Sequence, residues 1–581
     1  MRTKLINKSE IKNIIKIHGF LGNIIASFVR FILSMKKLEV LYNKNIDKKG
    51  AEFSRGILKD MNVTIDCNRE NLQHIPEEGG FVVVCNHPFG GVDGLIIHDL
   101  ISKKRPDTKY MVNFILAMIE PLEQDMFSVN PFSDNKELKN SSSGIRAAIS
   151  HLKEGHGLVI FPAGEVSTYH GNKYTEDLPW TSSVIKLIKN AGVPIIPAYF
   201  HGTNSRLFHF LGKIHPMLRT VWLPRELLKR RNKTVKFVIG KPVMPAESAQ
   251  YESAAEFGTY LRNRTYALEA NVEPLVCIKK TNTKVSELAP AVNPALIQAE
   301  IEANSESILF SVSKYSCHLF DAANIPNIIT ELGRKREESF RAIGEGTGKA
   351  SDLDEYDAYY KHLVLWDNET KCIAGAYRVG LGRDIMTDYG IKGFYTSTLF
   401  TYAEDTPYLE QSIELGRSFV SLEYKRENLP LYLLLKGLGF TLKKYTDYKY
   451  FLGAVSISNS FPLFYQSCIH YALQLKYSDP EYTRYVQCRN PFKPNYLRVD
   501  LSAFAKRFNN VEDSDSFISV LSGATYRVPT LLKKYLKMNG HALGYNIDPD
   551  FSDCLDVLVL LEIGQLPADD MATFTNEKAG A

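Results

Sequence analysis

Short apolar runs alternate with helical stretches between residues 81 and 268. The runs are five or six residues long and nearly continuous in apolar residues, which is typical of strands buried on both faces; they cover residues 81–85, 157–161, 194–199 and 235–239. Helical patterns follow them at 144–152, 180–190 and 254–268. Strands and helices in alternation predict an α/β domain.

The alternation returns after a polar stretch. Residues 279–296 are rich in Thr, Asn, Ala and Pro and lack an apolar period, which is typical of an interdomain linker. Beyond it the pattern predicts strands at 362–366, 372–379, 393–399 and 419–422, and a helix at 431–438 that ends at Gly439. We therefore expect one α/β domain at 51–278, a second α/β or α+β domain at 297–567, and a frayed tail at 568–581.

Length and composition agree with two folded domains. A single core rarely grows beyond about 250 to 300 residues, and this chain has 581. The formal net charge of +5 is too small for this length to indicate nucleic acid as a partner. The eight cysteines show neither a CxxC pair nor metal-ligand spacing, so we expect no disulfide framework, no metal site and a reducing compartment.

Positive charge gathers in the first 50 residues, around an apolar run at 20–35. The run is shorter than the ~20 apolar residues that span a bilayer, and Asn23, Ser27, Arg30 and Ser34 give it one polar stripe at helical spacing. Residues 1–50 are therefore expected to form a basic amphipathic segment that lies in a membrane interface, peripherally, on the cytoplasmic face of the inner membrane. An ordinary amphipathic helix packed on its own domain would show the same pattern.

A histidine and an aspartate flank a glycine turn after the first predicted strand. His87 follows residues 81–85, Gly90 and Gly91 permit a sharp reversal, and Asp93 lies where the next helix begins. The reversal can bring the carboxylate to one imidazole nitrogen, so that the other nitrogen takes a proton from an alcohol. His87 and Asp93 are the candidate catalytic base and orienting acid, although a lone His near an Asp is more often structural.

Four ordered blocks carry a resemblance that covers roughly residues 52–241. They are FVVVCNHPFGGVDGLII at 81–97, MFSVNP at 126–131, FPAGEVS at 161–167 and VPIIPAY at 193–199. This order resembles the PlsC-like family of phospholipid and glycerol acyltransferases. His87 and Asp93 stand at the positions of the family's histidine and aspartate, with five intervening residues where the family has four.

The third block departs from the family pattern FPEGTRS. Ala163 and Val166 replace a glutamate and an arginine, and the arginine of the second block is replaced by Asn130 or Pro131. Such arginines would hold a glycerol phosphate through charge-assisted hydrogen bonds worth roughly 1.5 to 3 kcal/mol each. We therefore expect glycerol phosphate to be a poor acceptor.

Gly164 and Glu165 are the substrate-binding candidates within the third block. Glu165 is the ionisable group retained there, and it could bind the acceptor's amine or hydroxyl. A carboxylate that caps a helix after a glycine turn would explain it equally well.

A second set of motifs lies in the C-terminal half. It comprises AGAYRVG at 374–380, FYTSTLF at 394–400, IELGRSFV at 413–420, VPTLLKKYLKMNG at 528–540 and DPDFSDCLDVLVL at 548–560. These motifs resemble the acyl-carrier-protein-dependent N-acyltransferases that make ornithine and glycine lipids, within the GNAT-like fold. The resemblance implies a splayed pair of strands that holds the pantetheine thioester.

The same resemblance implies that Glu414 helps to remove a proton from the attacking amine. Arg417 would pair with Glu414 or hold the amino acid's carboxylate, and Arg378 is a further candidate substrate contact. A Glu and an Arg three residues apart also form ordinary surface pairs. Nearby, GEGTGKAS at 344–351 lacks the spacing of a phosphate loop, so we expect a flexible loop that could close over substrate.

Together the resemblances imply an acyltransferase that makes an amino-acid lipid. It would N-acylate ornithine or glycine with a 3-hydroxyacyl group and then O-acylate the lyso lipid. The thioester donor would be acyl carrier protein or acyl-CoA, without a bound cofactor; the partners would be the carrier protein, the amino acid and the membrane surface. Two alternatives stay open: a lysophospholipid or glycerol-phosphate acyltransferase with a non-catalytic second domain, and a non-catalytic membrane-binding protein.

Overall fold

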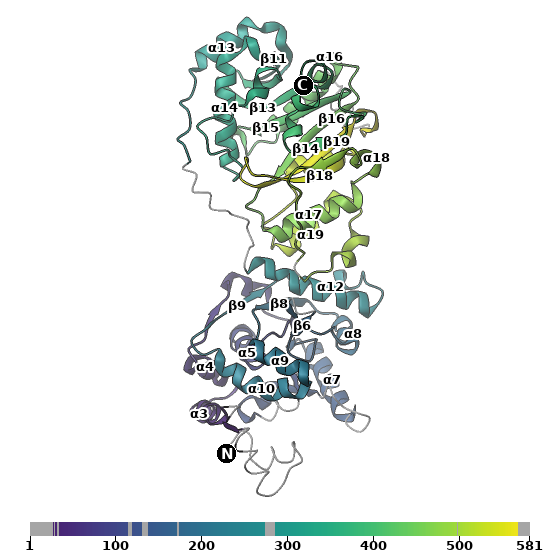
Figure 1. Ribbon diagram of the computed structural model, residues 1–581. Helices are drawn as coiled ribbons and strands as arrows, with labels where there is room; N and C mark the ends of the chain where they lie inside the picture. Colours follow the sequence, from purple (N-terminus) through teal and green to yellow (C-terminus); the bar gives the residue numbers. More distant parts are fainter. Residues whose placement is uncertain are drawn as a thin grey trace. The chain divides into compact units, whose positions relative to one another are not determined.

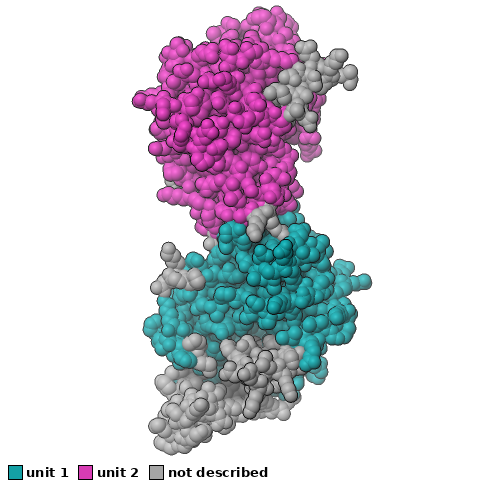
Figure 2. Space-filling model, turned by 90° about the vertical axis from the view of Figure 1, so that its right-hand side faces the viewer, with its two compact units in different colours: residues 1–273, 497–504, 520–524 teal, residues 274–496, 505–519, 525–581 magenta. Residues whose placement is uncertain are grey.

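The computed structural model describes residues 27, 30, 31, 34–113, 119–129, 138–170, 174–272, 285–496 and 498–567. Most of the predicted run at 20–35, part of the predicted linker, the tail from residue 568, and Asn130 and Pro131 lie outside these described residues. The chain divides into two compact units, coloured separately in Figure 2. Unit 1 comprises residues 1–273, 497–504 and 520–524, and unit 2 comprises residues 274–496, 505–519 and 525–581.

Unit 1 is an α/β fold around a sheet with strand order β1-β9-β8-β2-β5-β3-β4 among the described residues. All neighbouring strands are parallel except β8 and β9. The strands are β1 (Thr64–Asp66), β2 (Phe81–Cys85), β3 (Lys109–Asn113), β4 (Met126–Val129), β5 (Gly157–Ile160), β8 (Ile195–His201) and β9 (Thr234–Ile239), with a separate ribbon of β6 (Thr168–His170) and β7 (Tyr174–Glu176). Every residue of β2 is buried, as expected of a parallel strand that is covered on both faces.

Helices surround this sheet (Figure 1). They are α3 (Met35–Asn45), α4 (Gly50–Asp60), α5 (Gly91–Lys104), α7 (Leu138–Lys153), α8 (Ser182–Asn190), α9 (Arg206–Ile214), α10 (Pro216–Lys229), α11 (Pro245–Ser248) and α12 (Ala254–Ala267). The strands predicted in this half match β2, β5, β8 and β9 to within two residues. The apolar runs were enough to locate these strands, because both faces of each strand are buried in the core.

The described end of the predicted N-terminal segment packs on unit 1. Met35 and Leu38 of α3 are buried against Trp222 and Leu228 of α10. Residues 35–45 therefore match the second interpretation from the sequence, an amphipathic helix packed on its own domain, rather than a helix in a membrane interface. Among the described residues, no helix is both long enough and apolar enough to cross a membrane.

Two short segments from the C-terminal half belong to unit 1, whereas the sequence pattern predicted continuous domains. Arg498 donates a hydrogen bond to the Tyr199 hydroxyl at 2.6 Å and forms an ion pair with Glu269 at 2.7 Å. Asp500 exchanges two hydrogen bonds with Asn263, one through its backbone N–H and one through its carbonyl. Such contacts join residues more than 200 positions apart, so the local pattern of apolar residues carries no sign of them.

Unit 2 is built on a mostly antiparallel sheet with strand order β10-β11-β12-β13-β15-β16-β19-β18 among the described residues. The strands are β10 (Ile308–Val312), β11 (Tyr315–Asp321), β12 (Lys361–Asp367), β13 (Cys372–Leu381), β15 (Ser412–Val420), β16 (Tyr450–Ile457), β18 (His541–Asp548) and β19 (Cys554–Glu562), with β14 (Phe400–Tyr402) and β17 (Val486–Cys488) in a separate ribbon. The pair β15 and β16 is parallel, and it interrupts the antiparallel order.

The helices of unit 2 are α13 (Pro294–Ala303), α14 (Pro326–Arg341), α15 (Gly382–Tyr389), α16 (Leu429–Lys444), α17 (Leu463–Lys476), α18 (Pro480–Thr483), α19 (Val511–Leu521) and α20 (Thr530–Lys537). The predicted end of a helix at Gly439 is wrong, because α16 continues to Lys444. Gly437 and Gly439 are buried, and a Cβ at Gly437 would lie 2.8 Å from the Cys317 sulfur. At Gly437, therefore, the missing side chain serves close packing within a continuous helix.

The predicted strand at 393–399 is also wrong. That stretch forms two short 3₁₀ turns, Ile391–Gly393 and Tyr395–Thr398, before β14 begins. The backbone N–H groups of Tyr395 and Thr396 donate to the carboxylate of Glu414, at 3.0 and 2.8 Å. A buried side-chain acceptor has replaced the neighbouring strand as hydrogen-bond partner.

Candidate active sites

The structure brings His87 and Asp93 together at the carboxyl end of β2. The Gly90 backbone has φ +87°, which allows the reversal between the strand and α5. The Asp93 Oδ2 atom lies 3.0 Å from Nδ1 of His87 and also accepts the backbone N–H groups of Phe89 and Gly90. The extra residue in the spacing is thus absorbed by the glycine turn. Asp93 is fully buried, so the contact orients the imidazole and leaves Nε2 for chemistry.

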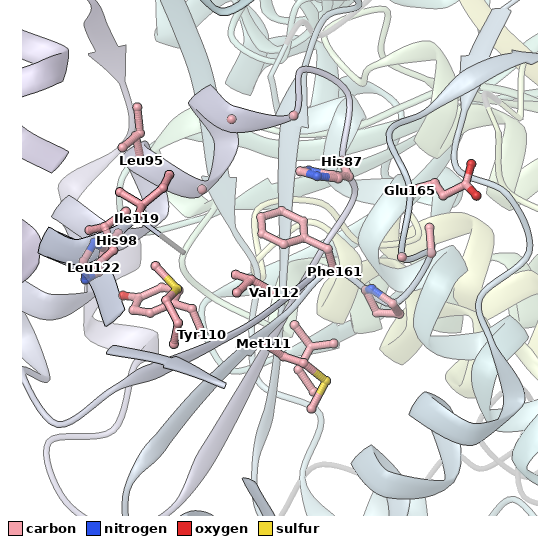
Figure 3. A pocket seen from close by; sticks show the side chains of 18 of the residues that line it. His87, Leu95, His98, Tyr110, Met111, Val112, Ile119, Leu122, Phe161 and Glu165 are labelled. Carbon is pink, nitrogen blue, oxygen red and sulfur yellow. The ribbon is translucent and has the colours of Figure 1, made fainter. Parts of the chain in front are cut away.

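A cavity of about 890 Å³ adjoins His87 in unit 1 (Figure 3). Its walls are mostly apolar and come from several elements, including Leu41, Ile57, Leu95, Met111, Leu122, Phe161 and Val184. The imidazole of His87 lies against the ring of Phe161, with the ring centroids 4.2 Å apart. A cavity of this size and composition suits the hydrocarbon chain of an acyl group.

Two polar side chains interrupt the apolar wall. Ser54 of α4 and His98 of α5 are buried and share a hydrogen bond of 2.8 Å between Oγ and Nδ1. The Nε2 atom of His98 lies 3.1 Å from Asp125, which ends the short 3₁₀ turn Glu120–Asp125. This connected set joins residues over 70 positions apart, and the sequence analysis did not single it out.

The third block places Gly164 and Glu165 on the wall of the same cavity. Gly164 has φ +71°, and a Cβ there would meet no atom within 4 Å, so its backbone faces open space. Glu165 forms an ion pair of 2.5 Å with Arg219 of α10. Its charge is therefore neutralised by Arg219. The sequence analysis expected Glu165 to bind the acceptor or to cap a helix, and it did not foresee this ion pair.

A buried aspartate that the sequence analysis missed supports the dyad. Asp177 accepts hydrogen bonds from the backbone N–H of His87 at 3.1 Å and from the Ser167 hydroxyl at 2.6 Å. Its second oxygen accepts from Trp180 at 3.2 Å, and burial raises its pKa. Asp177 thereby ties the third block to the histidine. Nothing in its local sequence distinguishes it from a loop aspartate.

In unit 2 a cavity of about 440 Å³ lies where β15 and β16 part. The two strands pair only at residues 412–414 and 450–452; beyond them, residues 415–420 and 453–456 line the cavity. Arg417 and Ser418 oppose Tyr377 of β13 in a β-bulge, and Arg417 has φ +48°. A non-glycine residue in this conformation is uncommon and clusters at functional sites.

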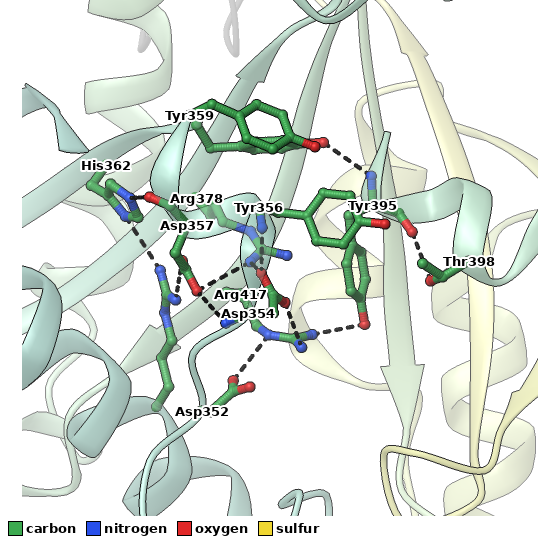
Figure 4. Close-up of polar contacts among 12 residues, drawn as sticks. Asp352, Asp354, Tyr356, Asp357, Tyr359, His362, Arg378, Tyr395, Thr398 and Arg417 are labelled. Carbon is green, nitrogen blue, oxygen red and sulfur yellow. Dashed lines mark hydrogen bonds and ion pairs between the residues drawn. The ribbon is translucent and has the colours of Figure 1, made fainter. Parts of the chain in front are cut away.

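Arg417 lies on the wall of this cavity, among acidic and aromatic side chains (Figure 4). It donates to the Tyr395 hydroxyl at 2.9 Å and forms ion pairs with Asp352 at 2.9 Å and Asp354 at 3.3 Å. It does not pair with Glu414, which was one of its two predicted roles. These contacts leave a second N–H on each terminal nitrogen of the guanidinium.

Glu414 and Arg378 lie away from the lining of this cavity. Glu414 is buried and accepts hydrogen bonds from the Tyr360 hydroxyl and from the backbone of the turn Tyr395–Thr398, and burial raises its pKa. Arg378 is fully buried and forms ion pairs with Asp354 and Asp357. The structure thus places both residues in internal polar networks; their proposed contacts with substrate stay predictions.

Three further carboxylates line the unit 2 cavity: Glu345, Asp548 and Asp556. Glu345 belongs to the segment interpreted as a flexible loop, whose backbone at Thr347 and Gly348 is held by the buried carboxylate of Glu337. Asp556 is the third residue of strand β19 and precedes its apolar run, and an acid beside such a run is a signal that could have identified it. Among the described residues, no group of three or more His, Cys, Asp or Glu side chains could hold a metal ion.

Both halves of the chain are similar to known acyltransferases. A family model described as acyltransferase matches residues 20–274, and one described as acetyltransferase (GNAT) domain matches residues 336–435. A glycine N(alpha)-acyltransferase of Bacteroides thetaiotaomicron is 30% identical over 302 residues, which are 49% of this chain and 88% of the relative.

A second relative comes from the same bacterium. A lyso-glycine lipid O-acyltransferase is 24% identical over 260 residues, which are 44% of this chain and 93% of the relative. The crystal structure of the 1-acyl-sn-glycerophosphate acyltransferase PlsC from Thermotoga maritima shares 17% identity, covering 41% of this chain and 84% of that chain with a TM-score of 0.25.

The matches to the acyltransferase and GNAT models confirm the predicted enzyme class and the predicted order of an acyltransferase domain followed by a GNAT domain. The chain covers nearly nine tenths of the length of the N-acyltransferase that it matches at 30% identity. It therefore belongs to the glycine N(alpha)-acyltransferase family and carries, in the same polypeptide, a PlsC-like acyltransferase domain.

Proposed function

We propose that the chain is a bifunctional synthase of a glycine lipid. Unit 2 attaches a 3-hydroxyacyl group to the amino group of glycine, and unit 1 esterifies the 3-hydroxyl of that product with a second acyl group. The observation that carries the proposal is the presence in one chain of the His87–Asp93 dyad on an apolar cavity and of a second cavity with its own charged groups. The names of two relatives from one bacterium correspond to the two steps and favour glycine over ornithine.

The ester step follows from the geometry of the dyad. With Asp93 bound to Nδ1, the Nε2 atom of His87 accepts the proton of the lyso lipid's hydroxyl. The oxygen attacks the thioester carbonyl, the C–O bond forms, and collapse of the tetrahedral intermediate breaks the C–S bond. The imidazolium then returns its proton to the leaving thiolate, so His87 ends the cycle neutral. The acyl chain lies in the apolar cavity.

The amide step takes place in unit 2. The opening between β15 and β16 would admit the pantetheine arm of acyl carrier protein, which we propose as the donor; acyl-CoA carries the same thioester. The unused N–H groups of Arg417 would hold the carboxylate of glycine. Because both steps occur in one chain, the lyso intermediate stays at high effective concentration.

The surface of α9 and α10 supports attachment to a membrane. Exposed apolar side chains follow these two adjacent helices, with Phe210 and Ile214 58% and 59% exposed; the others are Leu207, Leu218 and Val221. Residues 206–225 include Arg206, Lys213 and Arg225 but no Asp or Glu. Apolar and basic side chains without acids fit an anionic lipid surface. We place the protein peripherally on the cytoplasmic face of the inner membrane.

The test is lipid analysis of a bacterial host that lacks amino-acid lipids and expresses this chain. With isotope-labelled glycine and ornithine supplied separately, mass spectrometry should find a diacylated lipid that carries the glycine label. A diacylated lipid that carries the ornithine label would support the two proposed acylation steps but would show that the amino acid is ornithine rather than glycine. An increase in phosphatidic acid alone, without an amino-acid lipid, would contradict the proposal.

A further inference from the structure

The cavity of unit 2 holds carboxylates that the proposed steps have not used. Glu345 is 7% exposed and lines the cavity, and among the described residues its carboxylate has no hydrogen-bond partner. Asp556 is 3% exposed, and its hydrogen bonds with Ser456 and Cys554 both reach Oδ1. Keeping a carboxylate largely out of water with an oxygen that accepts no hydrogen bond is costly, which favours a role for these oxygens in binding a ligand in the cavity.

The surroundings of these carboxylates keep them able to exchange protons near neutral pH. Burial and the charge of Asp556 raise the pKa of Glu345 to about 8, while Lys425 acts in the opposite direction. Burial raises the pKa of Asp556 to about 7; the charge of Asp548 also raises it, and Ser456, Cys554 and Arg417 lower it. Two interacting carboxyl groups of this kind titrate as a pair.

Glu414, in contrast, has its carboxylate occupied. Its oxygens accept from the Tyr360 hydroxyl and from two backbone N–H groups, and the side chain does not line the cavity. To act as a base it would have to give up contacts that hold the turn Tyr395–Thr398. The cavity therefore offers a better-placed acceptor than the residue implied by the motif.

We propose that Glu345 and Asp556 bind the α-ammonium group of the amino acid and accept its protons during N-acyl transfer. This inference rests on the proposed N-acyltransferase function of unit 2. Arg417 lines the same cavity, so the cavity presents a cation and two acids to an amino-acid zwitterion. Ligands that lack either charge would lose one of the two contacts.

A pair of acceptors fits the proton balance of the reaction. One carboxylate takes a proton from the ammonium, and the neutral amine attacks the thioester carbonyl to form the C–N bond. The second carboxylate takes the proton that the nitrogen then loses. The C–S bond breaks, the thiolate leaves and recovers one proton from the pair, and the other proton goes to solvent. The products are the amide, the thiol and one proton.

Kinetics of the variants Glu345→Gln and Asp556→Asn test this assignment, with the exposed Glu369→Gln as the control. In each test variant, kcat/KM for glycine just above pH 8, where the wild-type pair has lost most of its protons, should fall by about 100-fold or more, since general bases contribute 10²- to 10⁴-fold. The wild-type rate should rise with pH through 7 to 8 as the pair loses its proton. The wild-type rate should then level off, whereas the rate of the variants should keep rising with pH, because only glycine's own free amine remains to react.

Binding provides a readout that does not require turnover. Calorimetry should show that the wild-type protein binds glycine more tightly than glycolate, which keeps the carboxylate but lacks the ammonium, and that either variant loses this preference. Circular dichroism and thermal melting would establish that the variants are folded. An unchanged preference together with wild-type kinetics would overturn the assignment. If the preference holds but no amide forms, the proposed function fails and the ammonium site remains.

Discussion

The carboxylate of Asp177 accepts a hydrogen bond from the backbone N–H of His87, 3.1 Å away, although the two residues are 90 positions apart. The same oxygen accepts from Ser167, whose own backbone N–H donates to the carbonyl of His87 at 2.9 Å. The catalytic histidine of the proposed ester step is therefore held at its backbone by Asp177 and Ser167, and at its ring by Asp93.

Replacing Asp177 should weaken this support. In Asp177→Asn, the amide NH₂ must face either the Trp180 N–H or the donors from His87 and Ser167, so one buried donor loses its acceptor. We expect a loss of about 1 to 3 kcal/mol in the free energy of unfolding, together with slower ester formation. Chemical denaturation and an esterification assay measure the two effects. Glu176→Gln, a neighbouring change that does not touch His87, should keep near wild-type activity.

Removing the base should separate the two steps. In His87→Ala only the ester step loses its proton acceptor, so monoacylated glycine should accumulate while diacylated lipid falls by about 10²- to 10⁴-fold. Asp93→Asn should also lower the amount of diacylated lipid, because the imidazole ring loses its orienting carboxylate. Lipid mass spectrometry follows both products. Wild-type amounts of diacylated lipid in His87→Ala would show that His87 is not the base.

The length of the O-linked acyl chain should depend on Gly94. This residue lies on the cavity wall in α5, and a Cβ there would meet no atom within 4 Å, so a larger side chain can grow into the cavity. Gly94→Leu should shift the product toward shorter chains without destabilising the helix, which favours Leu over Gly. Gly94→Ala adds only a methyl group and serves as the control. An unchanged chain distribution in both variants would mean that the chain lies elsewhere.

Membrane attachment should depend on the exposed apolar side chains of α9. The double change Phe210→Ser and Ile214→Ser removes side chains that are more than half exposed, so it should lower binding to anionic vesicles at least about tenfold. Met244→Ser, at an exposed apolar residue that is not on these helices, should bind like the wild type. Vesicle sedimentation measures both. Equal pelleting of the two variants would place the membrane contact on another surface.

Phosphate-bearing acceptors should be poor substrates. Ala163 and Val166 are buried and uncharged at the positions where the family pattern FPEGTRS has a glutamate and an arginine, and Arg219 is already paired with Glu165 of the same block. Loss of two charge-assisted contacts should disfavour lysophosphatidic acid by more than about 100-fold relative to a 3-hydroxyacyl glycine. Competition between the two acceptors measures this ratio. Preferential formation of phosphatidic acid would instead favour the phospholipid alternative.

The sequence by itself determined the features that depend on neighbouring residues. Apolar runs located β2, β5, β8 and β9, since strands buried on both faces must be apolar throughout. The dyad could also be predicted from the sequence, because His87 and Asp93 are six positions apart and a single glycine turn joins them. The acyltransferase and GNAT resemblances rested on such short, continuous motifs.

Tertiary structure alone decided the features that join distant segments. Asp177 reaches His87 across 90 positions, residues 497–504 return to unit 1, and Glu345 meets the environment of Asp556 only after the sheet of unit 2 has formed. The family resemblance also implied Glu414 as a base, whereas folding surrounds its carboxylate with donors. The physical reason is that hydrogen bonding and burial depend on which groups approach in space, and a linear pattern specifies only the neighbours along the chain.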